Sequence, residues 1–218
     1  MKDRASEATH DPYVLPEGLP VPLDDGAADD LPGMRIPDVV LPSSMGDVAL
    51  ADLAAERLVL YVYPQTGPPD KPVPPGWDEI PGARGCTPQS CGFRDHAAEL
   101  AAFGARVAGV SSQSLAEQQE FARRTKMPFP IISDEQFVLA ATLSLPTFEF
   151  HGARFYKRLA LVAESGVVAK VFYPVFPPDR NAADVLDWLS RHRPQRVRRT
   201  PAPATSRLTR YLRGRHPH

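Results

Sequence analysis

The residues best suited to chemistry are two cysteines, Cys86 and Cys91, which lie five positions apart in the segment GCTPQSCGFRD. Thr87 and Pro88 are typical of the beginning of a helix, and the apolar residues after them keep helical spacing as far as Gly104. Cys86 would thus lie where unpaired backbone N–H groups and the helix dipole stabilise an anion. Because the thiolate is the reactive form of cysteine, this position favours nucleophilic attack by Cys86.

Other interpretations of the pair stay open. Unpaired cysteine is often a small buried hydrophobe, and the spacing alone does not decide between that role and a redox role. A zinc site is disfavoured, because His96 would be a third ligand but lies off the cysteine face of the helix, with no fourth ligand near it in the sequence. The chain contains neither a P-loop nor a dinucleotide-binding glycine pattern, so nucleotide chemistry has no support.

The elements that must position the cysteines alternate in type along the chain. The apolar run LVLYVY at 58–63 is typical of a buried strand, and Ser114 with Glu117 forms a capping-box pattern at the start of a helix that ends before Pro128. The remaining expected elements are a strand at 106–110, an apolar segment at 130–132, a short helix near 137–143, an irregular segment, a hairpin of 158–162 and 167–172 turning at Ser165–Gly166, and a last helix capped by Asn181. This order predicts an α/β, thioredoxin-like fold with a central mixed β-sheet flanked by helices.

The bulk properties exclude several classes of protein. A chain of 218 residues fits one domain with appendages, and a formal net charge of −1 argues against nucleic acid as the main partner. No apolar run suits a signal peptide or a transmembrane helix, so we expect a cytoplasmic protein with no membrane partner. In that reducing compartment the two cysteines are expected to cycle as thiols.

Both ends of the chain are biased in charge. Residues 1–33 hold eight carboxylates against two basic side chains, whereas residues 191–218 hold nine arginines and no acid. We therefore expect a flexible acidic arm over 1–33, a folded domain over 34–192 and a disordered Arg-rich tail over 193–218. Apolar residues in the tail outline a short basic amphipathic helix that could bind an anionic membrane or nucleic acid, but a solvated tail is favoured.

A proline-rich segment over about 65–84 separates the first strand from Cys86. It contains too many prolines for regular structure, and a compact domain keeps so long a loop mainly for function. Trp77 could form part of a lid over Cys86, although an aromatic residue in a loop more often docks for stability.

Three segments together resemble the peroxiredoxins, the AhpC/TSA family, and within them the bacterioferritin-comigratory or Q group. The segments are LVLYVYP at 58–64, GCTPQSCGFRD at 85–95 and RLALVAESGVV at 158–168. The likeness spans about residues 34–191. It implies a thiol peroxidase in which Cys86 attacks the peroxide, Cys91 is the resolving thiol, Arg158 holds the thiolate and Pro64 shields it. A guanidinium suits that role, because it is always charged and offers several donors.

The chain departs from this family in one spacing. The family has Pro-x3-Thr-x2-Cys, whereas Pro64 lies 22 positions before Cys86 and Ala83 stands where the threonine is expected. Thr66 could supply the hydroxyl that orients the peroxide if the proline-rich segment is an insertion that loops out after it. Thr66 could equally be an ordinary turn residue.

The resemblance implies reduction of hydrogen peroxide or organic hydroperoxides without a metal or organic cofactor. Cys86 would become a sulfenic acid, condense with Cys91 and be reduced by a thioredoxin-like dithiol. Two alternatives remain: a thiol-disulfide oxidoreductase on the same fold, against which the CxxxxC spacing counts, and a non-catalytic redox-responsive binding protein.

Overall fold

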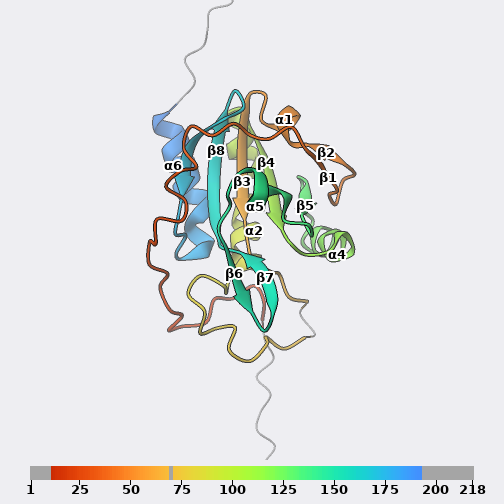
Figure 1. Cartoon of the computed structure of the whole chain (residues 1–218), viewed down its shortest axis with the longest axis vertical. Helices are drawn as coiled ribbons and strands as arrows, with labels where there is room; N and C mark the ends of the chain where they lie inside the picture. Colours follow the sequence, from red (N-terminus) through yellow and green to blue (C-terminus); the bar gives the residue numbers. More distant parts are fainter. Residues whose placement is uncertain (1–10, 69–70, 193–218) are drawn as a thin grey trace, which may run out of the picture.

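The computed structural model describes residues 11–68 and 71–192, and a five-stranded sheet in the order β5-β4-β3-β8-β9 forms their centre (Figure 1). The strands are β3 (Arg57–Val62), β4 (Ala105–Ser111), β5 (Ile131–Ser133), β8 (Leu159–Glu164) and β9 (Val167–Phe172). β3 and β4 run parallel, as do β4 and β5, whereas β8 is antiparallel to both β3 and β9. The predicted central mixed sheet and its C-terminal hairpin are confirmed.

Helices cover both faces of this sheet. They are α1 (Leu50–Leu53), α2 (Cys86–Asp95), α3 (Ala97–Ala102), α4 (Leu115–Thr125), α5 (Val138–Thr142) and α6 (Asn181–Arg191), with a 3-10 turn, η1 (Pro178–Arg180), before α6. The predicted capping box at Ser114 and Glu117 is present at the start of α4.

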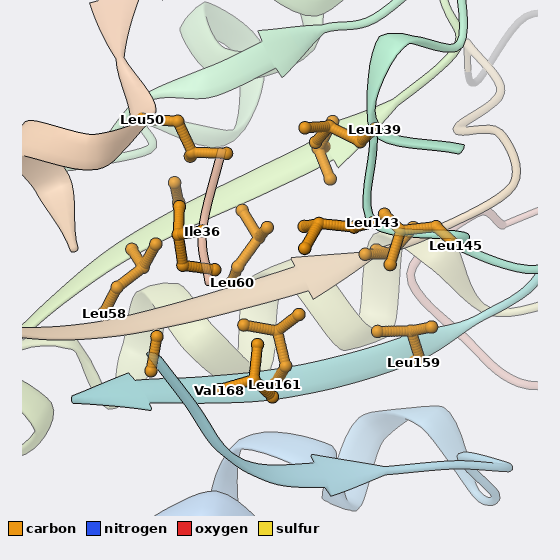
Figure 2. Packing of buried hydrophobic residues seen from close by; sticks show 14 of the residues in the cluster. Ile36, Leu50, Leu58, Leu60, Leu139, Leu143, Leu145, Leu159, Leu161 and Val168 are labelled. Carbon is orange, nitrogen blue, oxygen red and sulfur yellow. The ribbon is translucent and has the colours of Figure 1, made fainter. Parts of the chain in front are cut away.

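The central strand β3 divides the core in two, because successive side chains of a strand point to opposite faces. Leu58 and Leu60 pack with residues from α1 and α5, as Figure 2 shows. Val59 and Tyr61 pack on the other side with residues from α2, α3, α4 and α6. All six residues of β3 are buried, as the continuous apolar run predicts. The strand therefore forms a rigid base from which the chain runs toward Cys86.

Three local predictions were wrong. The segment expected to be irregular contains a hairpin of β6 (Thr147–Phe150) and β7 (Ala153–Tyr156), whose turn places His151 and Gly152 at φ 50° and 76°. The sequence did not indicate this turn, because a non-glycine residue, His151, adopts the left-handed conformation there. Thr87 was expected to cap a helix beginning at Pro88, but α2 begins at Cys86 with Gly85 as its cap; Asn181 is likewise the first residue of α6 rather than its cap. The short pair β1 (Val40–Leu41) and β2 (Val48–Ala49) was not expected.

Residues 11–33 differ from the flexible arm that the acidic composition predicted. Ala28 and Leu31 are buried in the core, and the Gly33 N–H donates to the Val168 carbonyl over 2.8 Å. Asp25 accepts hydrogen bonds from Lys157 and from the Tyr173 hydroxyl, which together lower the pKa of its carboxyl to about 2. Ala28, Leu31 and these hydrogen bonds fix the segment to the domain, whereas its carboxylates and the side chains of Val14, Val21 and Leu23 stay exposed.

Two expectations fall outside the described residues: the course of residues 1–10, and the disordered Arg-rich tail over 193–218. Within the described ranges, no helix has the length and apolar character needed to cross a membrane.

Candidate active site

Cys86 is the first residue of α2, and its side chain is only 3% exposed. Gly85 precedes it with φ 97°, a conformation that favours glycine. A Cβ at Gly85 would lie 2.4 Å from a Pro178 carbon and 2.6 Å from a Leu15 carbon, so the chain also needs glycine here for space. The cysteine is thus held at the N-terminus of α2 by close packing of segments distant in sequence.

Arg158, just before β8, holds the sulfur and the loop that leads to it. Its guanidinium donates over 3.1 Å to Cys86 Sγ, and Arg158 is itself 3% exposed. Its other acceptors are the carbonyl oxygens of Gly82 (3.1 Å), Ala83 (3.1 Å), Arg84 (2.9 Å) and Gly85 (3.5 Å) and the side-chain oxygen of Gln89. All of these partners are neutral groups, so none of them neutralises the guanidinium charge that lies beside Cys86 Sγ.

The chain leaving β3 also contacts the sulfur. Pro64 is buried, and the Gln65 N–H donates to Cys86 Sγ over 3.4 Å. Thr66 is buried too, but its hydroxyl donates to Gln113 Oε1 over 3.1 Å, and its N–H donates to the same oxygen over 2.8 Å. The expectation that Thr66 orients a peroxide therefore stays a prediction, since this geometry directs its hydroxyl to Gln113.

The proline-rich segment forms one wall of a cavity of about 170 Å³ that reaches Cys86. Val73, Trp77 and Arg84 contribute from this segment, and Pro12 contributes from the N-terminal segment. Trp77 is 5% exposed. Its ring packs on the β6–β7 hairpin, with centroid distances of 6.0, 5.4 and 5.1 Å to Phe148, Phe150 and Phe155. Trp77 therefore docks for stability and lines the cavity at the same time.

Cys91 lies on α2 with Cys86 and is half-buried, and both thiols are free. Burial raises the pKa of the Cys91 thiol, and the nearby Arg94 guanidinium partly opposes that effect. Five residues of regular helix separate the two Cα atoms by about 8 to 9 Å, whereas a disulfide needs them within about 7 Å. The structure thus holds the reduced pair apart.

Other charged side chains near Cys86 in the sequence form contacts of their own. His96 Nδ1 lies 2.7 Å from the Glu99 carboxylate, Arg94 contacts Asp95 at 2.8 Å, and Arg84 contacts Asp78 at 3.0 Å. Residues 11–68 and 71–192 contain no group of three or more His, Cys, Asp or Glu side chains able to hold a metal ion.

Sequence reasoning missed Gln89 and Gln113, the two glutamines that bind Arg158 and Thr66. The position of Gln89 could have indicated its role, because it lies one helical turn after Cys86 on the same buried face of α2. Gln113 gave none, because it binds Thr66 across 47 residues of chain.

The model of the Redoxin family matches residues 31–186 of this chain. The chain is 28% identical over 162 residues to a putative peroxiredoxin bcp of Coxiella burnetii, covering 72% of this chain and 97% of the relative. It is 29% identical over 158 residues to the chloroplastic peroxiredoxin Q of Arabidopsis thaliana, covering 72% of this chain and 66% of that protein.

Solved structures similar to this chain are also peroxiredoxins. The peroxidoxin BcpB of Mycobacterium tuberculosis is 27% identical with a TM-score of 0.60, covering 75% of this chain and 98% of that one. Peroxiredoxin Q of Xanthomonas campestris, at 23% identity and a TM-score of 0.56, covers 80% and 98% and shares the fold. The predicted thioredoxin-like fold is confirmed by these likenesses.

Proposed function

Since the chain belongs to the Redoxin family, we propose that it works as a peroxiredoxin of the bacterioferritin-comigratory, or Q, type, a thiol peroxidase in which Cys86 attacks the peroxide. The observation that carries this assignment is the environment of Cys86 Sγ. The sulfur lies at a helix N-terminus and accepts hydrogen bonds from Arg158 at 3.1 Å and from the Gln65 N–H at 3.4 Å. An anionic sulfur and a developing negative charge on oxygen are both stabilised by such donors.

In the first step the Cys86 thiolate attacks one oxygen of the peroxide. A sulfur–oxygen bond forms while the oxygen–oxygen bond breaks, and the leaving oxygen takes up a proton as water or an alcohol. The sulfur is oxidised by two electrons to a sulfenic acid, and the peroxide is reduced. Arg158 stabilises the charge that moves onto oxygen, and Pro64 keeps bulk water from the sulfur. The substrate is hydrogen peroxide or an organic hydroperoxide.

In the second step the Cys91 thiolate attacks the sulfenic acid sulfur, forming the intrachain disulfide and releasing water. The distance between the two positions on α2 requires the first turns of that helix to unwind before this reaction. An external dithiol of the thioredoxin type then reduces the disulfide by thiol exchange, as expected of a cytoplasmic enzyme.

The test compares Cys86→Ser with Cys91→Ser. Peroxide consumption is measured with a thioredoxin system, and sulfenic acid is trapped with a cyclic dione and counted by mass spectrometry. Cys86→Ser should lose both reactions completely, whereas Cys91→Ser should still form one sulfenic acid per chain, because only Cys86 contacts substrate. Equal loss of the first oxidation step in both variants would refute the assignment. Reduction of insulin disulfides without peroxide consumption would identify a thiol-disulfide oxidoreductase instead.

A further inference from the structure

A line of buried hydrogen bonds connects α6 to the reactive sulfur. Asn181 Oδ1 accepts from Gln89 Nε2 over 2.9 Å, Gln89 Oε1 accepts from Arg158 Nη1, and Arg158 Nη2 donates to Cys86 Sγ over 3.1 Å. Gln89 and Asn181 are 0% and 1% exposed, so neither exchanges these bonds with bulk water. Buried polar groups of this kind are costly to leave unpaired.

The direction of each bond in this line follows from the chemistry of arginine. A guanidinium has donors and no acceptor, so Gln89 must turn its oxygen toward Arg158. The Gln89 nitrogen then points away from Arg158 and needs an acceptor of its own, which is Asn181 Oδ1. Without that acceptor, the Gln89 amide loses the contact that fixes its orientation. A flipped amide would place an NH₂ group against the guanidinium.

Close packing brings Asn181 within reach of α2. Pro178 of η1 lies against Gly85, and a Cβ on Gly92 would stand 3.2 Å from the Asp179 carbonyl oxygen. The two glycines therefore let the start of α6 approach the helix that carries Cys86 more closely than larger residues would allow. Asn181 meets Gln89 across 92 residues of chain as a result.

We propose that Asn181 is a positioning residue for the reaction of Cys86, acting through Gln89 to hold the Arg158 guanidinium on the sulfur. The effect of this role on catalysis rests on the proposed function. The positioning itself is a property of the reduced protein and can be measured without peroxide. Asn181 does not touch substrate.

The test replaces Asn181 by Leu, which has a similar size and no acceptor, in a Cys91→Ser background. The second-order rate of sulfenic acid formation should fall about threefold to tenfold, the worth of one hydrogen bond. Hydrogen exchange of the Arg158 guanidinium N–H groups, followed by NMR, should become faster by a similar factor. Asn181→Asp keeps an acceptor in the same place, so exchange of the Arg158 N–H groups should stay within about twofold of the parent. Its rate is not compared, because a buried carboxylate adds a charge near Cys86 Sγ.

Two controls separate positioning from a loss of stability. Val185→Ala removes core volume from α6 but changes no hydrogen bond between Asn181, Gln89, Arg158 and Cys86, so it should lower the free energy of unfolding and leave both readouts unchanged. In a Gln89→Leu background, adding Asn181→Leu should have no further effect on the rate, because the line is already broken.

Three results would overturn the proposal: parental rate and exchange in Asn181→Leu, additive effects in the double variant, or an equal rate loss in Val185→Ala. If Asn181→Leu does not fold, Asn181→Ala provides the same comparison. A parent protein that does not react with peroxide would refute the proposed function, while the exchange measurement would still decide the role of Asn181.

Discussion

Arg158 donates to the reactive sulfur and also holds the loop before Cys86. Replacing it by Met removes both contributions, which a rate and a stability measurement detect separately. Met is unbranched and replaces the aliphatic part of the arginine side chain, but it is shorter and has no charge and no N–H donor. The contact to Cys86 Sγ disappears, and removal of one such donor from a reacting centre lowers a rate by about 10²- to 10³-fold. We expect a loss of that size in the rate of sulfenic acid formation, measured by rapid mixing with peroxide in a Cys91→Ser background.

The same change should lower stability. Of the four carbonyl oxygens bound by Arg158, those of Ala83 and Gly85 belong to buried residues that water does not reach. Each would lose a charged donor, while the Gly85 oxygen keeps the Gln89 N–H at 3.0 Å and the Ala83 oxygen keeps only the weak Cys86 thiol contact at 3.5 Å. The free energy of unfolding should therefore fall by about 1 to 2 kcal/mol, measured by urea titration. Arg158→Lys should recover part of the rate but little of the stability, because an ammonium group keeps the charge and loses the planar array of donors.

Arg94→Met is the matched control for this experiment. Arg94 is an arginine of α2 whose guanidinium binds Asp95 and the Thr125 carbonyl. Its loss should leave the rate of the first step within about twofold, since exposed ion pairs contribute little. Equal rate losses in the two variants, or a normal rate in Arg158→Met, would refute the role given to Arg158.

Three further outcomes are expected. On oxidation, amides of residues 85–94 should lose hydrogen-exchange protection while residues 58–63 keep theirs, because α2 must open locally; an intact α2 in the disulfide form would contradict this. Trp77→Ala should lower the free energy of unfolding by about 3 kcal/mol in urea titration, through lost packing on the hairpin, and an unchanged value would show that the loop is not docked. Asp25→Asn should destabilise the protein at neutral pH by less than about 1 kcal/mol, because this ion pair is partly exposed. The pKa of Asp25 is lowered to about 2, so its contribution is full above the ordinary value of 3.8 and is lost as the pH falls toward 2, where urea titrations of variant and parent should converge.

Local patterns were sufficient to predict the main elements. The run at 58–63 has the composition of a doubly buried strand, and the capping box at Ser114 needs only its own neighbours. The start of the helix that carries Cys86 was predicted to within two residues. Arg158 was found through a resemblance, and its place beside the sulfur agrees with that interpretation.

What the sequence did not reveal depends on contacts between distant segments. Acidic composition predicted a free arm over 1–33, because nothing nearby shows that Leu31 enters the core or that Asp25 meets Lys157. The sequence likewise suggested Arg158 as an electrostatic partner only, whereas it also ties down the loop before Cys86. The pairing of Gln89 with Asn181 spans 92 residues and has no local signal.

The position of Trp77 gives the protein an internal optical reporter. Its indole lies in the wall of the cavity that reaches Cys86, while the chain's other tryptophan, Trp188, stacks on His192 with 4.2 Å between ring centroids. Trp188 is not among the residues that line this cavity, so its signal should change little when the sulfur is oxidised. Fluorescence changes should therefore come from Trp77 and follow its surroundings as the sulfur is oxidised and α2 opens. Each step of a turnover could then be timed in the unlabelled protein.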